Sequence, residues 1–234
     1  MCGFIGYDER TITETPDLFD KLNSLSDCIA RIPSYSAYPA FGGDLSKRIP
    51  LIIEDDGIKL VNAIWWFDAY QNNDLATALG NRTSFNARNL QSPFWRAALK
   101  HQRGIVLASS IGESKLVGKT KHQYLMQSKS PFLLGALYKK LPNNDYACAV
   151  ITRDAHPKME AYHDKAFPLF LPVLSHFLDK WLLAKGEIPS EVEQLLESPK
   201  LFPNLHVQRV KTYKSGQPMG KISENLISDH PEYL

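Results

Sequence analysis

The chain has 234 residues, 44% of them hydrophobic and 22% charged, and a net charge of +2. These values are ordinary for a soluble globular protein and allow a sizeable core within one domain. The charge is too small to indicate nucleic-acid binding by itself. The longest apolar stretch, residues 166–174, contains two prolines and is far shorter than the ~20 residues that span a bilayer. These features exclude a transmembrane protein.

The three cysteines, Cys2, Cys28 and Cys148, show no paired spacing. An odd count argues against a disulfide framework, and the absence of a C-x-x-C pattern argues against a structural zinc site. The start of the chain lacks the basic segment and apolar run of a signal peptide. We therefore expect a cytoplasmic protein without cofactor or metal.

The first hundred residues predict alternating short strands and helices. Thr15-Pro16 and Ser92-Pro93 are both typical helix starts, with a capping hydroxyl before a proline. The expected elements, in chain order, are a buried strand over 1–7, a helix from Thr15 to Pro33, an ordered loop over 34–48, a hairpin of 50–53 with 58–61 around the turn 55–57, and a helix over 92–101.

The rest of the chain reads mainly as strands, followed by helices. Strands are expected over 104–109, 122–127, 132–138, 146–152, 167–171 and 206–212, and helices over 155–162, 175–184 and 190–197. Ser190 and Glu193 have the spacing of a capping box. The order of elements predicts an α+β fold with a mostly antiparallel sheet. The polar residues 215–234 are expected to form a loosely held tail.

Cys2 is the sharpest candidate for chemistry. Removal of Met1 would expose a residue with both a free amine and a thiol, whose reference pKa values are roughly 8 and 8.5. Both groups are then partly nucleophilic near neutral pH. Together they can capture an aldehyde, the amine as a Schiff base and the thiol by closing a thiazolidine ring. The alternative is an incidental cysteine, because free cysteines are often plain core residues.

Three further polar residues are candidates for a reaction centre. Asn86 and Arg88 lie two residues apart, so their side chains point the same way on an extended segment and suit a phosphate beside a polar centre. Glu113 follows an apolar strand, and a carboxylate half out of water there can act as a general acid or base. A polar loop and a solvated glutamate are the plainer alternatives.

His163 and the pair Trp65-Trp66 complete the candidates. His163 can move protons near pH 7. With His156 and Glu160 it also invites a metal-site interpretation, but the spacing is not that of a zinc protease. Adjacent tryptophans on a strand point to opposite faces, so at most one should be in the core and the other is a candidate stacking surface for unpaired bases. Purely structural roles stay open for all of them.

Taken together, these segments resemble the SOS-response-associated peptidase family, whose members crosslink to abasic sites in single-stranded DNA. The resemblance rests on an ordered set of motifs that reaches to about residue 184. The matching segments are Met1-Cys2-Gly3, Tyr35 to Pro39, Trp65-Trp66, Asn86-Ala87-Arg88, Ile105 to Glu113, and His163 to Pro168. Phe4, Ser36, Asn89-Leu90-Gln91 and Lys165 depart from the family pattern, and several of these changes remove groups that would hold phosphate.

The resemblance implies a single domain over 1–214, with a barrel-like β core flanked by short helices, and a tail over 215–234. It implies that Cys2 attacks the aldehyde of an abasic deoxyribose, that Asn86 positions the cysteine and the sugar, and that Glu113 and His163 transfer protons. The residues that it assigns to DNA binding are Arg88, Trp65, Trp66, Thr152 and Lys165.

It further implies single-stranded DNA with abasic sites as the partner, a monomer without metal, a nucleoid location in a bacterium, and a hydrolase or lyase activity within the DNA damage response. The same cysteine could release a leading peptide. Only Met1 precedes Cys2, so ordinary methionine removal would suffice.

Two other functions remain open. The start Met1 to Tyr7 also resembles the class II glutamine amidotransferases, in which an N-terminal cysteine attacks the glutamine amide. The chain contains no Asn-Gly segment of the kind that family uses. The other alternative is a non-catalytic module of the same fold, which holds single strands through Trp66, Arg88 and nearby basic residues.

Overall fold

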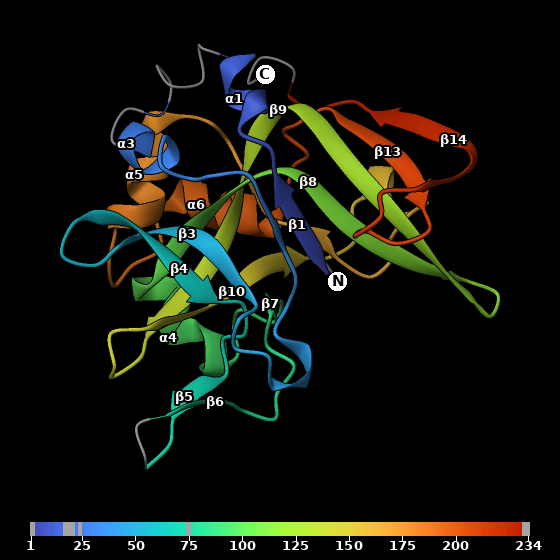
Figure 1. Cartoon of the computed structure of the whole chain (residues 1–234). Coiled ribbons are helices and arrows are strands. Elements are labelled where there is room, and N and C mark those ends of the chain that lie inside the picture. The colour runs from blue at the N-terminus through green and yellow to red at the C-terminus, as the bar shows by residue number, and fades with distance from the viewer. Residues whose placement is uncertain (1–2, 16–21, 23–24, 74–75, 231–234) are drawn as a thin grey trace.

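The computed structural model describes residues 3–15, 22, 25–73 and 76–230, with the side chains of 221–223 left out. Its centre is a twisted β-sheet, and short helices pack around it (Figure 1). The helices are α1 Arg10–Thr13, α3 Ser26–Ile29, α4 Pro93–His101, α5 Ser175–Leu183 and α6 Ser190–Glu197, with 3-10 turns η2 Phe41–Gly43 and η3 Pro157–Met159.

Five strands close into a barrel. These are β3 Arg48–Glu54, β4 Ile58–Ile64, β8 Arg103–Val117, β9 Thr120–Lys140 and β10 Tyr146–Arg153. The order is β8-β9-β10-β4-β3, and β3 pairs back with β8. All pairings in this ring are antiparallel except that of β10 with β4. The expected α+β fold with a barrel-like core is confirmed.

Further strands extend the sheet on both sides of the barrel. They are β1 Phe4–Tyr7, β2 Tyr35–Ala37, β7 Asn86–Ala87, β11 Phe167–Pro168, β12 Phe170–Leu171, β13 Leu205–Val210 and β14 Pro218–Leu226, while β5 Ala69–Gln71 and β6 Thr77–Leu79 form a separate pair. β1 lies against β8 and β13 lies against β9, each beyond the barrel. Residues 218–226 are therefore a strand of the sheet, and the expectation of a loosely held tail is wrong for this part.

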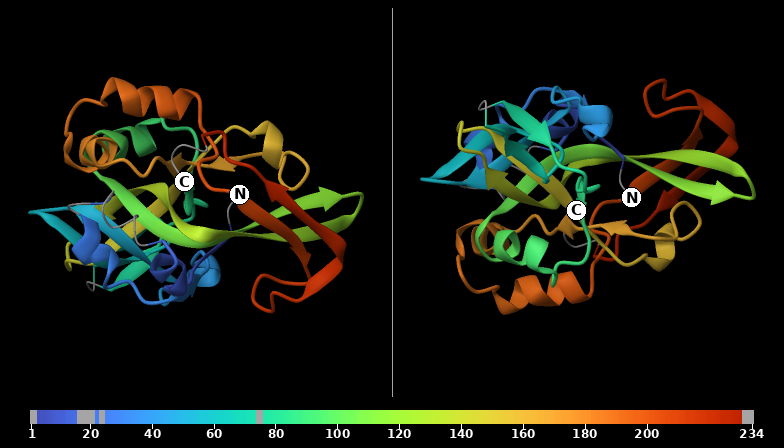
Figure 2. Two further views of the ribbon diagram at one scale, coloured as in Figure 1. Left: turned by 90° about the horizontal axis from the view of Figure 1, so that it is seen from above. Right: turned by 90° about the horizontal axis from the view of Figure 1, so that it is seen from below.

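The hairpin β8–β9 is the longest feature of the sheet. One half, Arg103 to Ala108, belongs to the barrel, and the other half, from Ser110, projects beyond it beside β13 and β14 (Figure 2). The register shifts between the two halves, because residues 128–131 of β9 have no counterpart on β8. Two predicted strands, 122–127 and 132–138, are thus one strand with an irregularity at Pro131.

The helix starts follow the sequence signals only in part. Helix α4 begins at Pro93, as expected from Ser92-Pro93, and Ser92 is its N-cap residue, but the Ser92 hydroxyl makes no capping hydrogen bond, so that part of the expectation is wrong. Helix α6 spans the predicted residues, but its N-cap position is Pro189 and no side chain caps it, so the capping box of Ser190 with Glu193 is wrong. Of the helix expected from Thr15 to Pro33, residues 16–21, 23 and 24 lie outside the described residues, and among the described ones α3 Ser26–Ile29 lies within the expected span.

Candidate active site

Glu113 lies inside β8 and is fully buried, with 0% of its surface exposed. The sequence suggested a carboxylate half out of water at a strand end. That expectation is wrong, because β8 continues to Val117 and the segment around Glu160 and His163 covers this part of it. Burial disfavours the charged carboxylate and raises the pKa of Glu113 to about 7. Both protonation states are therefore populated near neutral pH.

His163 lies against the same strand. Its Nδ1 is 2.8 Å from the carbonyl oxygen of Ser114 and 3.6 Å from Oε2 of Glu113. A carbonyl oxygen only accepts, so Nδ1 carries the hydrogen in this contact. Burial lowers the pKa of His163, which keeps the ring neutral near pH 7. In this neutral tautomer Nε2 is the basic nitrogen.

Asn86 on β7 and Thr152 on β10 lie on one face of the sheet. The short strand β7 runs parallel to β10 with Asn86 opposite Val150, and side chains two residues apart share a face. Thr152 is 1% exposed, and its Oγ1 forms no hydrogen bond with the described residues. Buried hydroxyls are almost always hydrogen-bonded, so this one is suited to a ligand atom.

One short segment connects these two groups. His163 contacts Ser114 on β8, and five residues later Pro168 pairs with Thr152 on β10. The start of the described chain reaches the same region, because the amide of Gly3 donates to the carbonyl of Gly112 at 3.3 Å. Cys2 lies outside the described residues, so its role stays a prediction.

Trp65 and Trp66 are both buried, with 0% and 7% of their surface exposed. The expectation that only one belongs to the core is wrong. β4 ends at Ile64, and the amide of Trp66 donates to the carbonyl of Ile64 at 2.8 Å, so the backbone turns and the alternation of a strand stops. Both indole nitrogens donate to backbone carbonyls, that of Trp65 to Phe85 at 2.9 Å.

Phe41 is the exposed aromatic of this cluster, with 56% of its surface accessible. Its ring packs edge-on against Phe85 at 4.9 Å and Trp66 at 5.5 Å between centroids. Phe41 is not among the candidates predicted from the sequence. The available signal was a large aromatic followed by Gly42-Gly43, both with positive φ, inside a loop of small and polar residues.

Arg88 follows β7, and its side chain lies at the surface beside Asp154. Its Nη2 lies 3.1 Å from Oδ1 of Asp154, and the two side chains are 52% and 94% exposed. An exposed pair of this kind is weak, so Arg88 can change partner at little cost. Lys165 is also exposed and forms no ion pair among the residues that the structure describes.

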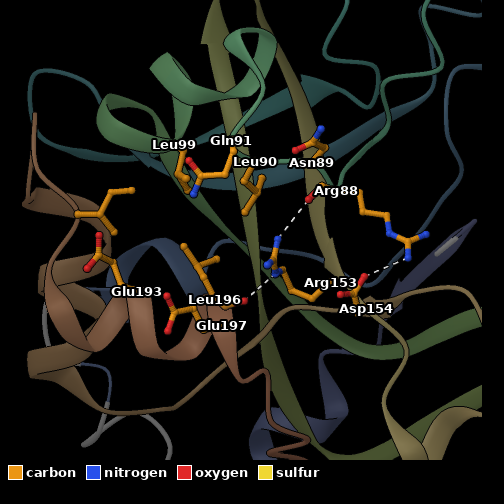
Figure 3. A pocket seen from close by; sticks show the side chains of 11 residues that line it. Arg88, Asn89, Leu90, Gln91, Leu99, Arg153, Asp154, Glu193, Leu196 and Glu197 are labelled. Carbon is orange, nitrogen blue, oxygen red and sulfur yellow. Dashed lines mark hydrogen bonds and ion pairs between the residues drawn. The ribbon is translucent and has the colours of Figure 1, made fainter.

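A pocket of about 490 Å³ opens beside Arg88, between the ends of β7 and β10 and helices α4 and α6 (Figure 3). Its second arginine, Arg153, is held by the backbone carbonyls of Leu196 at 2.7 Å and Arg88 at 3.2 Å. Three acidic residues line the same pocket: Asp154, Glu193 and Glu197. With more acidic than basic side chains, this pocket is poorly suited to phosphate.

The described part of the chain contains neither a cluster of metal ligands nor a membrane-spanning helix. No group of three or more His, Cys, Asp or Glu side chains there is placed to hold a metal ion, and His156 instead pairs with Asp229 at 3.0 Å. No helix in the same residues is long and apolar enough to cross a membrane.

Comparisons with known proteins support the assignment of the fold. Solved structures of similar architecture include a protein from Bacteroides thetaiotaomicron, with TM-score 0.60, 16% identity and coverage of 90% of this chain and 93% of the other. A protein from Bordetella bronchiseptica has TM-score 0.60 and 15% identity, covering 90% and 100%. A phage-related protein from the same organism has TM-score 0.57 and 18% identity, covering 90% and 95%. Such low identities show the fold alone.

The sequence itself identifies the family. No curated protein sequence matches this chain significantly. The family model described as SOS response associated peptidase (SRAP) matches residues 8–214, which include Asn86, Glu113, Thr152 and His163. The chain therefore belongs to the SRAP family.

Proposed function

We propose that this protein traps the aldehyde of an abasic site in single-stranded DNA through the amine and thiol of an N-terminal Cys2. The observation that carries the proposal is the buried pair of Glu113 and His163 beside the start of the chain. Cys2 is covalently bonded to Gly3, and consecutive Cα atoms are only ~3.8 Å apart. SRAP membership supports a role connected with DNA damage.

The chemistry forms two bonds to the aldehyde carbon and releases its oxygen as water. The Cys2 amine adds to the carbonyl and gives a carbinolamine, which loses water to form an imine. The thiolate then adds to the imine carbon, whose electron pair moves to the nitrogen and takes up a proton. The product is a thiazolidine. No oxidant, reductant or metal is consumed.

Glu113 and His163 supply the proton transfers. With a pKa of about 7, Glu113 can donate a proton to the departing hydroxyl and remove one in the reverse direction. The closed sugar must first open, which requires loss of the C1′ hydroxyl proton and protonation of the ring oxygen. Neutral His163, with Nδ1 donating to Ser114, can take the first proton at Nε2 and pass it on.

The remaining residues hold the DNA. Thr152 Oγ1 supplies a hydrogen bond within the site, and Asn86, on the same face of the sheet, positions the cysteine and the sugar. Phe41 offers an exposed ring on which an unpaired base can stack, whereas Trp65 and Trp66 are buried and cannot stack on a base. Arg88 can exchange Asp154 for a DNA phosphate.

The test uses purified protein and a single-stranded oligonucleotide with one abasic site. We expect a DNA–protein band that survives denaturation without any reductant, because a thiazolidine needs none. Cys2→Ser should lose this band but regain a crosslink when borohydride reduces the imine. Cys28→Ala, at a buried cysteine elsewhere in the chain, is the matched control and should behave as the wild type.

Other outcomes separate the alternatives. A band of equal strength in Cys2→Ser without borohydride would contradict the mechanism, and so would a mature N-terminus that retains Met1. Binding of the oligonucleotide with no covalent product would favour the non-catalytic module. The peptidase activity in the family's description would require a cleaved peptide bond. Mass spectrometry of the N-terminus reads out both that cleavage and the fate of Met1.

A further inference from the structure

The projecting end of the sheet has an unusual charge. It consists of residues 114–123, at the tip of β8–β9, and residues 207–220, from β13 to the start of β14; we call this the basic arm. It contains six Lys and Arg residues and no Asp or Glu. The rest of the chain then holds 21 basic and 25 acidic residues, so a nearly neutral protein has a strongly positive end and a slightly negative body.

The cations of the arm are mostly uncompensated. Lys115 donates to the carbonyl of Glu160 at 2.7 Å and lies 4.0 Å from Asp164. The other five form no ion pair with any residue that the structure describes, and all but Arg209 are exposed: Lys119, Lys121, Arg209, Lys211 and Lys214. Exposed like charges repel, so such a cluster is most stable when an anion binds to it.

The arm is a direct continuation of the candidate site. Glu113 and Val117 are four residues apart on β8, which is about 13 Å along a strand. The loop after β13 folds back beside β1, where Tyr213 stacks on Phe4 at 5.7 Å between centroids and its amide donates to Gln123. Lys211 and Lys214, on either side of Tyr213, therefore lie close to the start of the described chain.

We propose that the basic arm binds the phosphate backbone of the nucleic acid that continues past the candidate site. Two charged regions of the described chain are candidate paths for a strand held at Glu113, the pocket beside Arg88 and the arm. The pocket lined by Arg88 and Arg153 also carries three acidic side chains, so beyond the one phosphate that Arg88 can bind it repels a continuing backbone, whereas the arm presents only cations. The length of 13 Å corresponds to about four base pairs of a duplex.

The distribution of charge favours a linear polyanion over a lipid surface. Leu116, Val117 and Met219 are exposed near the tip, and apolar groups beside lysines could also touch a membrane. The cations are not confined to the tip, however. Lys115 is next to the site, Lys119 is in the turn after β8, Arg209 is on β13, and Lys211 and Lys214 follow β13. Strand β13 lies beside the hairpin β8–β9 (Figures 1 and 2).

The test compares two fourfold variants in the full-length protein. The arm variant is Lys119→Gln, Lys121→Gln, Lys211→Gln and Lys214→Gln. The control removes the same charge from helices α4 and α5 and the residues after α6, as Arg96→Gln, Lys100→Gln, Lys180→Gln and Lys200→Gln. Fluorescence anisotropy measures Kd against salt for labelled DNA without an abasic site, as a single strand and as a duplex.

We expect the arm variant to bind at least about tenfold more weakly at low salt, and the control to change less than about twofold. If each lysine contacts one phosphate, the slope of log K against log salt falls by about 3.6 for a duplex and about 2.8 for a single strand. The arm holds the form of DNA whose slope change reaches its own full value, because a form that the arm does not contact should show almost no change. Equal losses in both variants, or none, would overturn the proposal.

Two controls separate this inference from the proposed function, on which it rests. The crosslinking rate at saturating DNA should not change in the arm variant, because Glu113 and His163 are untouched. If no crosslink forms in any variant while binding of DNA without an abasic site still depends on the arm, the proposed function fails but the inference about the arm is still supported. Binding of phosphatidylserine vesicles that depends on the arm, without any DNA effect, would overturn the assignment to nucleic acid.

Discussion

The two ends of the projecting hairpin carry opposite chemistry on the same pair of strands. Around Glu113, β8 lies between β1 and β9 and is covered by the segment with His163, so a carboxylate is completely buried. Four residues further on, Leu116 and Val117 are exposed among lysines. The ladder between β8 and β9 runs through both places. The comparison shows that packing on the two faces of the strand, and not the strand itself, sets the chemistry of a side chain. A buried side chain has a shifted pKa, whereas an exposed charged side chain can only attract ions from the solvent.

The largest expected effect belongs to the buried end. Glu113→Gln keeps the shape but cannot exchange a proton, so we expect the crosslinking rate to fall by about 10²- to 10⁴-fold. Quench-flow or timed denaturing gels at saturating abasic DNA measure this rate. Glu160→Gln, at a solvent-exposed position of the covering segment, is the control and should leave it nearly unchanged. A small effect of Glu113→Gln would remove the acid–base role.

Glu113→Gln should lower the crosslinking rate, but near pH 7 and above it should raise the free energy of unfolding relative to the wild type. Folding raises the pKa of Glu113 from 4.5 to about 7, so the folded chain holds the proton more tightly than the unfolded chain. The stability this contributes is fully present below pH 4.5 and is lost as the pH rises to about 7, a change of about 3 kcal/mol.

Urea denaturation from pH 4.5 to 8 tests this linkage. Glu113→Gln has no such proton, so the wild type should lose stability relative to the variant as the pH rises. Parallel pH profiles for the two proteins would show that Glu113 is not buried in this way in solution.

A smaller effect is expected at the exposed aromatic cluster. Phe41→Ala removes the ring that lies over Trp66 and Phe85, and stacking of one base on an aromatic side chain contributes about 1–3 kcal/mol. Single-strand affinity should fall about tenfold, as measured by anisotropy. Tyr70→Ala, at another exposed aromatic on β5, should have no effect. Equal losses would point to general destabilisation.

The smallest effect is expected beside the pocket. Asp154→Asn releases Arg88 from an exposed ion pair that is worth at most about 1 kcal/mol, so single-strand affinity should rise by up to about fivefold. The gain should vanish in the double variant with Arg88→Gln. A rise that persists without Arg88 would show that the change in net charge alone is responsible.

Local patterns predicted the regular parts of the fold well. The hairpin around residues 55–57 and helix α4 follow from turn chemistry and from a proline at the helix start. The identity of Glu113 as a candidate acid also came from sequence. Its full burial did not, because that depends on a segment some fifty residues later in the chain.

The features that the sequence did not predict also depend on contacts or backbone turns that local patterns do not show. Arg103 opens an apolar strand, and nothing nearby in sequence indicates that it is buried. Its guanidinium donates to carbonyls at the ends of two helices, including Leu99 at 2.6 Å and Trp181 at 2.6 Å, and its pKa is lowered to about 10 by burial. Trp65 and Trp66 were misjudged because a turn in the backbone replaced the expected alternation.

The register shift between Ala108 and Ser110 has a consequence for how this protein can diverge. The irregular residues 128–131 separate the barrel half of the hairpin from its projecting half. The projecting half can therefore change in length without any change in the barrel half. Residues inserted or deleted in matched pairs next to the turn at Gly118 would lengthen or shorten the projection while every partner of Glu113 stays in place. Relatives could thus differ in the length of the projecting hairpin while conserving the same reaction centre.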